Sequence, residues 1–318
     1  MSVDGPPAQL HGTTTFFDGQ YGAVSVTLTI CCALALFNAI ELLFLIFTTF
    51  KRYSGLYFWS LVVASAGILP YVISILCEYF TLTNQLAGEV LSTFGWPMMV
   101  TGQSLVLYSR LGVVLGPEHH RILRPVKWMI IIDGIVFHIS TQVVMFGAYN
   151  AHPAREWALA YKYIEKIQMT GFTVQELIIS GLYVWRTLDI LKTVDDASGR
   201  SRRRRRTMME LFSINAVIII LDIALLVVEY QNRHVIEQSL KGFVYSFKLK
   251  LEFAVLRKLV DISGQRSRAS QSTFATISEA TMERTDSVMS SPKKVWGSLS
   301  RKDSAQKDCD DIVHLEKV

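Results

Sequence analysis

Charged residues are scarce in this chain, and cysteine is nearly absent. Only 19% of its 318 residues are charged and 50% are hydrophobic, whereas a soluble domain usually carries about 25% charged residues. The four cysteines show neither a disulfide framework nor the spacing of metal ligands. These shortages argue against a secreted disulfide scaffold and an ordinary soluble domain, and they favour an integral membrane protein.

The sequence also lacks the motifs of common catalytic sites. No G-x-S-x-G, H-E-x-x-H or phosphate-binding glycine loop occurs, so we predict no enzymatic activity. Residues 1–22 contain no Lys or Arg, which argues against a cleavable signal peptide. The net charge of +5 comes from short basic stretches rather than from a basic domain, so we expect no nucleic-acid partner.

Seven apolar stretches are long enough to cross a bilayer, for which a helix needs about 20 residues. They cover residues 23–50, 56–80, 91–114, 126–148, 164–188, 209–230 and 238–259. Lysines and a glutamate interrupt the last stretch, so its alternative interpretation is a helix on the membrane surface. The expected fold is an all-α membrane protein, a seven-transmembrane-helix bundle over residues 23–260.

Positive charge predicts the orientation of the bundle, since Lys and Arg near helix ends stay on the cytoplasmic side. Lys51 and Arg52 lie in the first connection, and Arg121 and Arg124 lie in the third. The N-terminal tail, residues 1–22, has no such residue. We therefore expect the N-terminus outside and the C-terminus in the cytoplasm. We expect the protein in the plasma membrane rather than in an internal membrane.

Six arginines are candidates for coupling to a cytosolic partner. Arg110 ends the third segment, and a run of five precedes the sixth: Arg202, Arg203, Arg204, Arg205 and Arg206. Each basic residue near an anionic leaflet contributes about 1 kcal/mol. The run is therefore also expected to bind anionic lipids, in addition to fixing the orientation of the chain during insertion.

The last part of the chain, residues 261–318, is rich in Ser and Thr and has no sustained apolar period. Such a composition predicts a disordered cytoplasmic tail. Within it, Arg266-Ser267-Arg268-Ala269-Ser270 is typical of a basophilic kinase target. Ser267 and Ser270 are candidate phosphorylation sites that would dock a cytosolic partner, and an unmodified tail is the alternative.

Polar residues inside the apolar segments mark the helix faces that point toward other helices. An ionised side chain at the bilayer centre costs about 3 kcal/mol or more, so Glu176, Asp222 and Lys248 need partners. We expect Lys248 to pair with Asp222, Glu41 or Glu176. The candidates for a polar cavity or for ion pairs are Asn38, Glu41, Gln103, Glu176, Asp222, Lys248 and Glu252. The alternative is that these groups only fix the register of the helices.

Small residues in the second segment predict close helix packing. Ser60, Ala64 and Gly67 follow one another at steps of four and three, so they share one face of the helix. In a membrane, such a face allows two helix backbones to approach each other closely. We therefore expect another helix to pack there.

No cofactor is expected. A lysine in the last segment invites comparison with retinal proteins, but residues 91–114 contain no Asp or Glu to serve as the counter-ion. Among the histidines, only His138 lies within a predicted span, which is too few for an intramembrane zinc site.

Three sequence runs carry a family resemblance: YFWS at 57–60, GQSLVLYSRL at 102–111 and YSFKLKLEFAVL at 245–256. They resemble a fungal family of seven-helix integral membrane proteins of uncharacterised function, similar in layout to rhodopsin-like and receptor-like proteins. The resemblance spans residues 20–262 and implies a fungal protein with a seventh span. Arg110 lacks the acidic neighbour found in rhodopsin-class receptors, so G-protein coupling is not implied.

The leading functional hypothesis is a receptor-like protein that senses a ligand in a polar intramembrane cavity and signals to a cytosolic partner. The first alternative is a proton-linked transporter or channel in which the same carboxylates carry protons. The second is a structural or scaffolding membrane protein without a small ligand.

Overall fold

The computed structural model describes residues 22–50, 53–115, 119–150, 154–195, 201–231 and 235–257. Their regular structure is entirely helical. Six helices follow in order: α1 (Ala23–Thr49), α2 (Leu56–Tyr79), α3 (Gln85–Leu115), α4 (His120–Asn150), α5 (Ala154–Asp195) and α6 (Ser201–Tyr230). A seventh helix covers residues 235–257. Seven helices, as predicted, are therefore present among the described residues.

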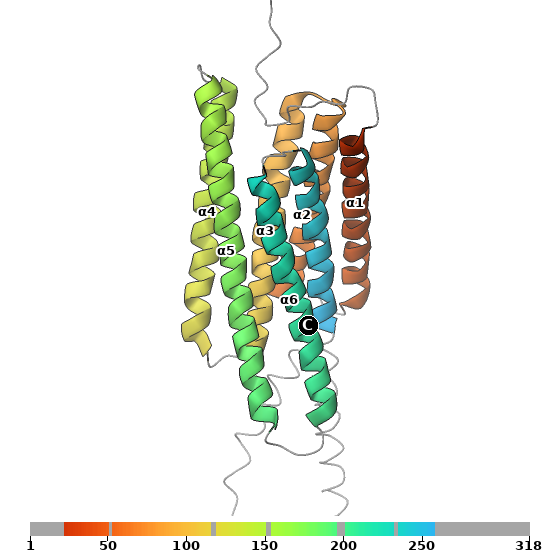
Figure 1. The fold of residues 1–318 in the computed structure, drawn as a ribbon, viewed down its shortest axis with the longest axis vertical. Coiled ribbons are helices and arrows are strands. Elements are labelled where there is room, and N and C mark those ends of the chain that lie inside the picture. The colour runs from red at the N-terminus through yellow and green to blue at the C-terminus, as the bar shows by residue number, and fades with distance from the viewer. Residues whose placement is uncertain are drawn as a thin grey trace, which may run out of the picture.

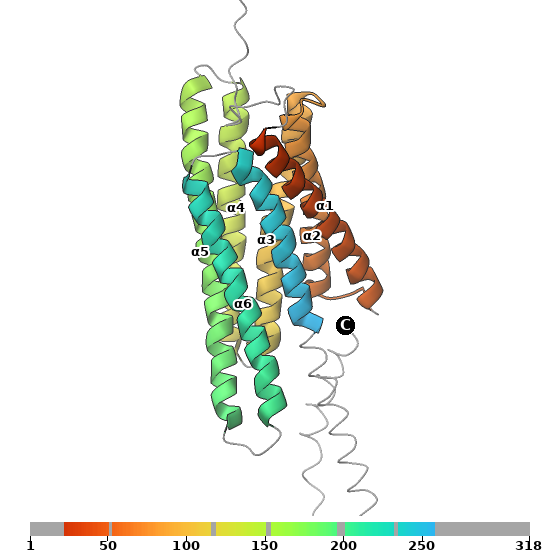
Figure 2. The same cartoon turned by 45° about the vertical axis from the view of Figure 1, so that its right-hand side comes forward.

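The helices form one bundle in which successive helices run in opposite directions (Figures 1 and 2). The end where α2 meets α3 is the upper end in Figure 1, and the end where α5 meets α6 is the lower end. The seventh helix lies inside this arrangement. Its residues bond to α1, α2, α3, α5 and α6, which makes it the hub of the bundle.

The distribution of side chains is the reverse of that in a soluble protein. Phe44 on α1, Ile135 on α4 and Ile220 on α6 are 69%, 55% and 63% exposed, whereas Lys248 and Glu252 are fully buried. Exposed apolar surface on this scale is stable in lipid and unfavourable in water. The bundle is therefore built for a membrane.

Five helices are long and apolar enough to cross a membrane among the residues described here: Ala23–Thr49, Leu56–Tyr79, Ala87–Leu115, His120–Gly147 and Met209–Tyr230. α5 and the seventh helix are not among these five. Both carry charged residues that the bundle buries, including Glu176 on α5 and Lys248 on the seventh helix.

The expected close packing of the second segment is present between α2 and α3. A Cβ added at Gly102 of α3 would lie 2.7 Å from the Ala64 Cβ. One added at Gly67 of α2 would lie 2.7 Å from the Met99 backbone nitrogen. Only glycine permits these approaches, so the small residues hold the two helices together.

Several helices extend beyond the predicted apolar stretches, and this corrects the assignment of two basic segments to loops. α6 begins at Ser201, so the backbone of residues 202–206 is helical. Likewise α4 begins at His120, which places Arg121 and Arg124 in its first turns. Arginine is a good helix former, and a helix continues readily past its apolar stretch. Residues 1–21 and 258–318, which include Ser267 and Ser270, lie outside the described residues.

Candidate functional site: three layers of buried ion pairs

The seventh helix carries a stripe of polar residues that faces the centre of the bundle. Glu237, Lys241, Tyr245, Lys248 and Glu252 follow one another at steps of four and three, so they share one face. All five are buried. The partners of this stripe lie on α3, α5 and α6 and divide it into three layers.

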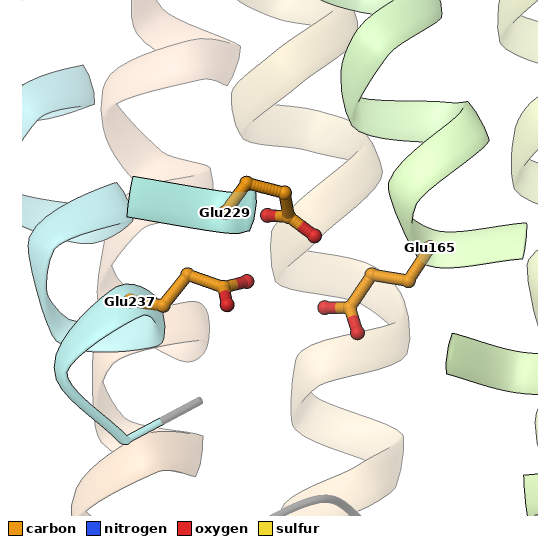
Figure 3. A group of neighbouring side chains, drawn as sticks. All are labelled: Glu165, Glu229 and Glu237. Atoms are coloured by element: carbon orange, nitrogen blue, oxygen red, sulfur yellow. The ribbon is translucent and has the colours of Figure 1, made fainter. Parts of the chain in front are cut away.

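The upper layer is centred on Lys241, whose Nζ contacts carboxylates from three helices. It lies 2.6 Å from Glu237, 2.8 Å from Glu229 of α6 and 3.3 Å from Glu165 of α5. Figure 3 shows the three carboxylates turned toward one another. The ammonium also lies 5.4 Å from the centre of the Trp96 ring on α3, within the range of a cation–π contact.

The same three carboxylates have the composition of a metal site. Their ligand oxygens lie within 4.8 Å of one another, and carboxylates are ligands for hard divalent cations. The Lys241 ammonium, however, stands among these oxygens and takes the place of a metal ion. The layer is therefore an ion-pair cluster in the described conformation.

A cavity of about 70 Å³ lies beside the upper layer. Its lining includes Lys241, Glu165, Gln238, Tyr71 and Trp96. Gln238 donates a hydrogen bond to Glu165 at 3.0 Å, and the Tyr71 hydroxyl donates to Gln238 Oε1 at 2.5 Å. One water needs roughly 15 Å³ by the same measure, so the cavity has room for several waters or a small polar molecule.

The middle layer pairs Lys248 with two carboxylates. Its Nζ lies 2.5 Å from Glu176 Oε2 of α5 and 2.5 Å from Asp222 Oδ1 of α6. The Tyr245 ring lies 4.3 Å from the same nitrogen. Of the three partners expected for Lys248, the structure selects Glu176 and Asp222.

The lower layer locks α3 to the seventh helix and to α6. Arg110 Nη1 lies 2.7 Å from Glu252 Oε2, and Arg110 Nη2 donates to Asn215 Oδ1 at 2.6 Å. The guanidinium also lies 4.1 Å from the Tyr183 ring centre of α5. The Tyr57 hydroxyl of α2 donates to the Glu252 carbonyl at 3.2 Å. The lower layer therefore joins the seventh helix to α2 and α3 and, through Arg110, α3 to α5 and α6.

The bundle matches one known protein family. The match to a family model covers residues 19–271, and thus all seven helices. The chain belongs to DUF7703, a domain of unknown function. No curated protein and no solved structure matches it.

Two predicted cavity residues of the DUF7703 domain lie away from the three layers. Glu41 pairs with Lys250 at 2.5 Å, and Asn38 accepts a hydrogen bond from Lys250 at 2.7 Å. The Glu41 side chain is 41% exposed. Lys250 is two residues from Lys248, about 200° around the helix, and so reaches α1 instead of the bundle centre. This peripheral pair is separate from the buried column.

Arg110, predicted as a coupling residue, is 2% exposed and engaged in the lower layer. The side chains of Arg202, Arg203, Arg204, Arg205 and Arg206 are outside the described part of the DUF7703 domain, although their backbone is helical.

The sequence-based list of site residues missed the upper layer. Glu165 and Glu237 lie at the edges of the predicted segments, where a charge needs no partner. The sequence does contain the signal for this layer, a repeat of seven that puts both residues on predicted polar stripes: Lys241 precedes Lys248 by seven residues, and Glu229 follows Asp222 by seven. Seven residues are close to two helical turns, so each pair shares a face.

Proposed function

We propose that this chain is a seven-span, receptor-like membrane protein that senses a small polar molecule in the cavity beside Lys241. The observation that carries the proposal is the continuity of the buried column. The cavity wall contains Lys241 of the upper layer, and the same helix carries Lys248 of the middle layer and Glu252 of the lower one. A shift of the seventh helix at the cavity would therefore also act on the contact between Glu252 and Arg110.

This link between the cavity and the lower end of the bundle depends on the contacts within each layer. The upper and middle layers join the seventh helix to α5 and α6, and the lower layer joins it to α3, which bonds in turn to α6. Packed interfaces of this kind switch between discrete arrangements and do not deform continuously. A ligand that bound Glu165 or Lys241 would favour one arrangement of the seventh helix. The contacts of that helix in the lower layer would then change as well.

The proposed orientation places the cavity toward the outside of the cell. The lower end holds the basic starts of α4 and α6, and basic residues stay in the cytoplasm. The lower layer would then face a cytosolic partner, and residues 202–206 would lie near the anionic leaflet of the plasma membrane. Co-purification with a heterotrimeric G protein that nucleotide releases would identify one such partner. A stable complex with another cytosolic protein would point elsewhere.

The coupling between layers is measurable without the ligand. Spin labels at positions 113 and 209, whose side chains are 43% and 51% exposed, report the distance between the lower parts of α3 and α6. Lys241→Met leaves the three upper carboxylates without their cation. We expect it to change the distance distribution at the lower end, with Glu165→Gln giving a smaller change of the same kind.

The matched control is Lys250→Met, which removes an ammonium from the same helix but belongs to the peripheral pair with Glu41. It should leave the distance distribution as in the unsubstituted protein. If neither Lys241→Met nor Glu165→Gln changes the distribution, or if Lys250→Met changes it as much, the layers are not coupled and the sensing proposal fails.

Proton-linked transport is a second candidate, favoured by the charge count of the column. The three layers contain six carboxylates and three cations. Like charges packed in a low-dielectric interior do not all ionise, so such a column holds protons. Vesicles containing the protein would then show proton flux that Glu176→Gln abolishes. Flux equal to that of protein-free vesicles would eliminate transport.

A further inference from the structure

Gln103 is a fully buried residue of α3 whose amide has no hydrogen-bond partner within the described parts of the chain. Neither Nε2 nor Oε1 is bonded, and its exposed fraction is 0%. A buried polar group left unbonded costs about 1–3 kcal/mol. The simplest reason for such a residue is that an ion or a small molecule, and not another side chain, binds its amide.

Helix geometry places Gln103 opposite Asp222. Arg110 of α3 is bonded to Asn215 of α6 at 2.6 Å, and the two helices run in opposite directions. Gln103 lies seven residues above Arg110, and Asp222 lies seven residues above Asn215. Each step is about two turns and roughly 10.5 Å, so both side chains lie at the middle layer and face the same core.

A second contact places Glu176 at this level. Gln175 Nε2 donates to Ser104 Oγ at 2.8 Å, and these residues are the direct neighbours of Glu176 and Gln103. The contact therefore joins α5 and α3 at the height of the middle layer. Gln103, Glu176 and Asp222 thus approach the middle layer from three helices.

The middle layer has unused oxygen atoms and an unbalanced charge. Glu176 and Asp222 each direct one oxygen at Lys248. Their other oxygens, Glu176 Oε1 and Asp222 Oδ2, have no hydrogen-bond partner among the described residues, and neither has Gln175 Oε1. With both carboxylates ionised, two carboxylates and one ammonium leave one negative charge in a buried place, where an unpaired charge is costly.

We propose that a monovalent cation of the size of sodium binds in the middle layer between Gln103, Glu176 and Asp222. Carboxylate and amide oxygens are hard ligands of the kind that such ions prefer. One positive charge neutralises the layer, whereas a divalent ion would reverse its sign. The site lies in the middle layer, apart from the cavity beside Lys241, and goes beyond the proposed function.

The test is the thermal unfolding of the purified full chain in nanodiscs, with sodium chloride replacing choline chloride at constant ionic strength and pH. An ion that binds only the folded state raises Tm, and the rise saturates with concentration. We expect sodium to raise the Tm of the unsubstituted protein by several degrees. Asp222→Asn and Gln103→Met should remove this response.

Gln103→Met keeps the size of the side chain and removes the unbonded amide, so the variant should fold and remain stable in choline chloride. If Asp222→Asn does not fold, the sodium response of Gln103→Met alone tests the site. The control is Asp189→Asn, whose carboxylate is 51% exposed on α5, and it should keep the sodium response.

Three results would overturn the site. The Tm could be the same in sodium and in choline, Gln103→Met could respond as the unsubstituted protein does, or, when the titration is repeated at several pH values, Tm could depend on pH and not on sodium. The last result would mean that a proton and waters occupy the layer. Failure of the cation site would leave the spin-label test of the sensing proposal unaffected, because that test reads the upper and lower layers without added sodium.

Discussion

The Arg110 guanidinium lies 2.7 Å from the Glu252 carboxylate, and neither side chain is more than 2% exposed. The contact joins residues that are 142 positions apart in the sequence. It holds the lower end of α3 against the hub of the bundle. Its removal is the most direct test of what the buried pairs contribute to stability.

Glu252→Gln should destabilise the protein strongly, because it leaves the Arg110 charge buried without a carboxylate. The loss of one partner from a buried pair costs about 3–5 kcal/mol. Reversible unfolding in mixed micelles measures the change. The double variant Arg110→Met, Glu252→Met should be more stable than Glu252→Gln, since it leaves no unpaired charge. A double variant that is less stable than the single one would contradict this account.

Lys248→Met and Asp222→Asn should act as a unit. Lys248→Met leaves two buried carboxylates at one place, and Asp222→Asn removes one of these charges. We expect the double variant to be destabilised by at least about 1 kcal/mol less than the sum of the single variants. The measurement is a double-mutant cycle on unfolding free energies. Simple additivity would show that the two side chains do not depend on each other.

Lys241→Ala should turn the upper layer into a site for divalent cations. The substitution removes the ammonium from among three carboxylates whose oxygens lie within 4.8 Å of one another. Ca²⁺ takes carboxylate oxygens at about 2.3–2.6 Å. Calcium should therefore raise the Tm of this variant and leave that of the unsubstituted protein unchanged. An equal response of both proteins at matched ionic strength would refute the prediction.

Gly102→Ala and Gly181→Ala should have opposite effects. A Cβ at Gly102 would lie 2.7 Å from the Ala64 Cβ and 2.8 Å from the Ala64 Cα, whereas one at Gly181 meets nothing within 4 Å. The first substitution forces α2 and α3 apart. The second restricts the unfolded chain and should stabilise α5 by about 0.5–1 kcal/mol. Unfolding measurements that show equal effects would contradict the assigned packing.

The helical fold was predictable because the apolar stretches are long and their periods clear. The helix ends were not, because basic residues such as Arg121 and the run at 202–206 form good helices outside the apolar stretch. Hydropathy detects the lipid-facing part of a helix and carries no signal for its continuation into the interface.

The partners of Lys248 were predictable only as a set, since depth in the membrane does not give the direction of a side chain. The structure assigns Glu41 to Lys250 and leaves Glu176 and Asp222 for Lys248. The angular step between positions 248 and 250 explains this division. The upper layer escaped because Glu165 and Glu237 occur near segment ends, where hydropathy alone predicts contact with water.

The low hydropathy of α5 and the seventh helix has a consequence for biosynthesis. A helix with Lys241, Lys248 and Glu252 partitions poorly into lipid by itself, since each ionised side chain near the centre costs about 2.5–3.5 kcal/mol. Its counter-charges stand on α3, α5 and α6, which leave the ribosome earlier. We therefore expect the translocon to retain the earlier helices until the last one emerges. A chain truncated before residue 235 should be degraded rapidly in a pulse-chase experiment.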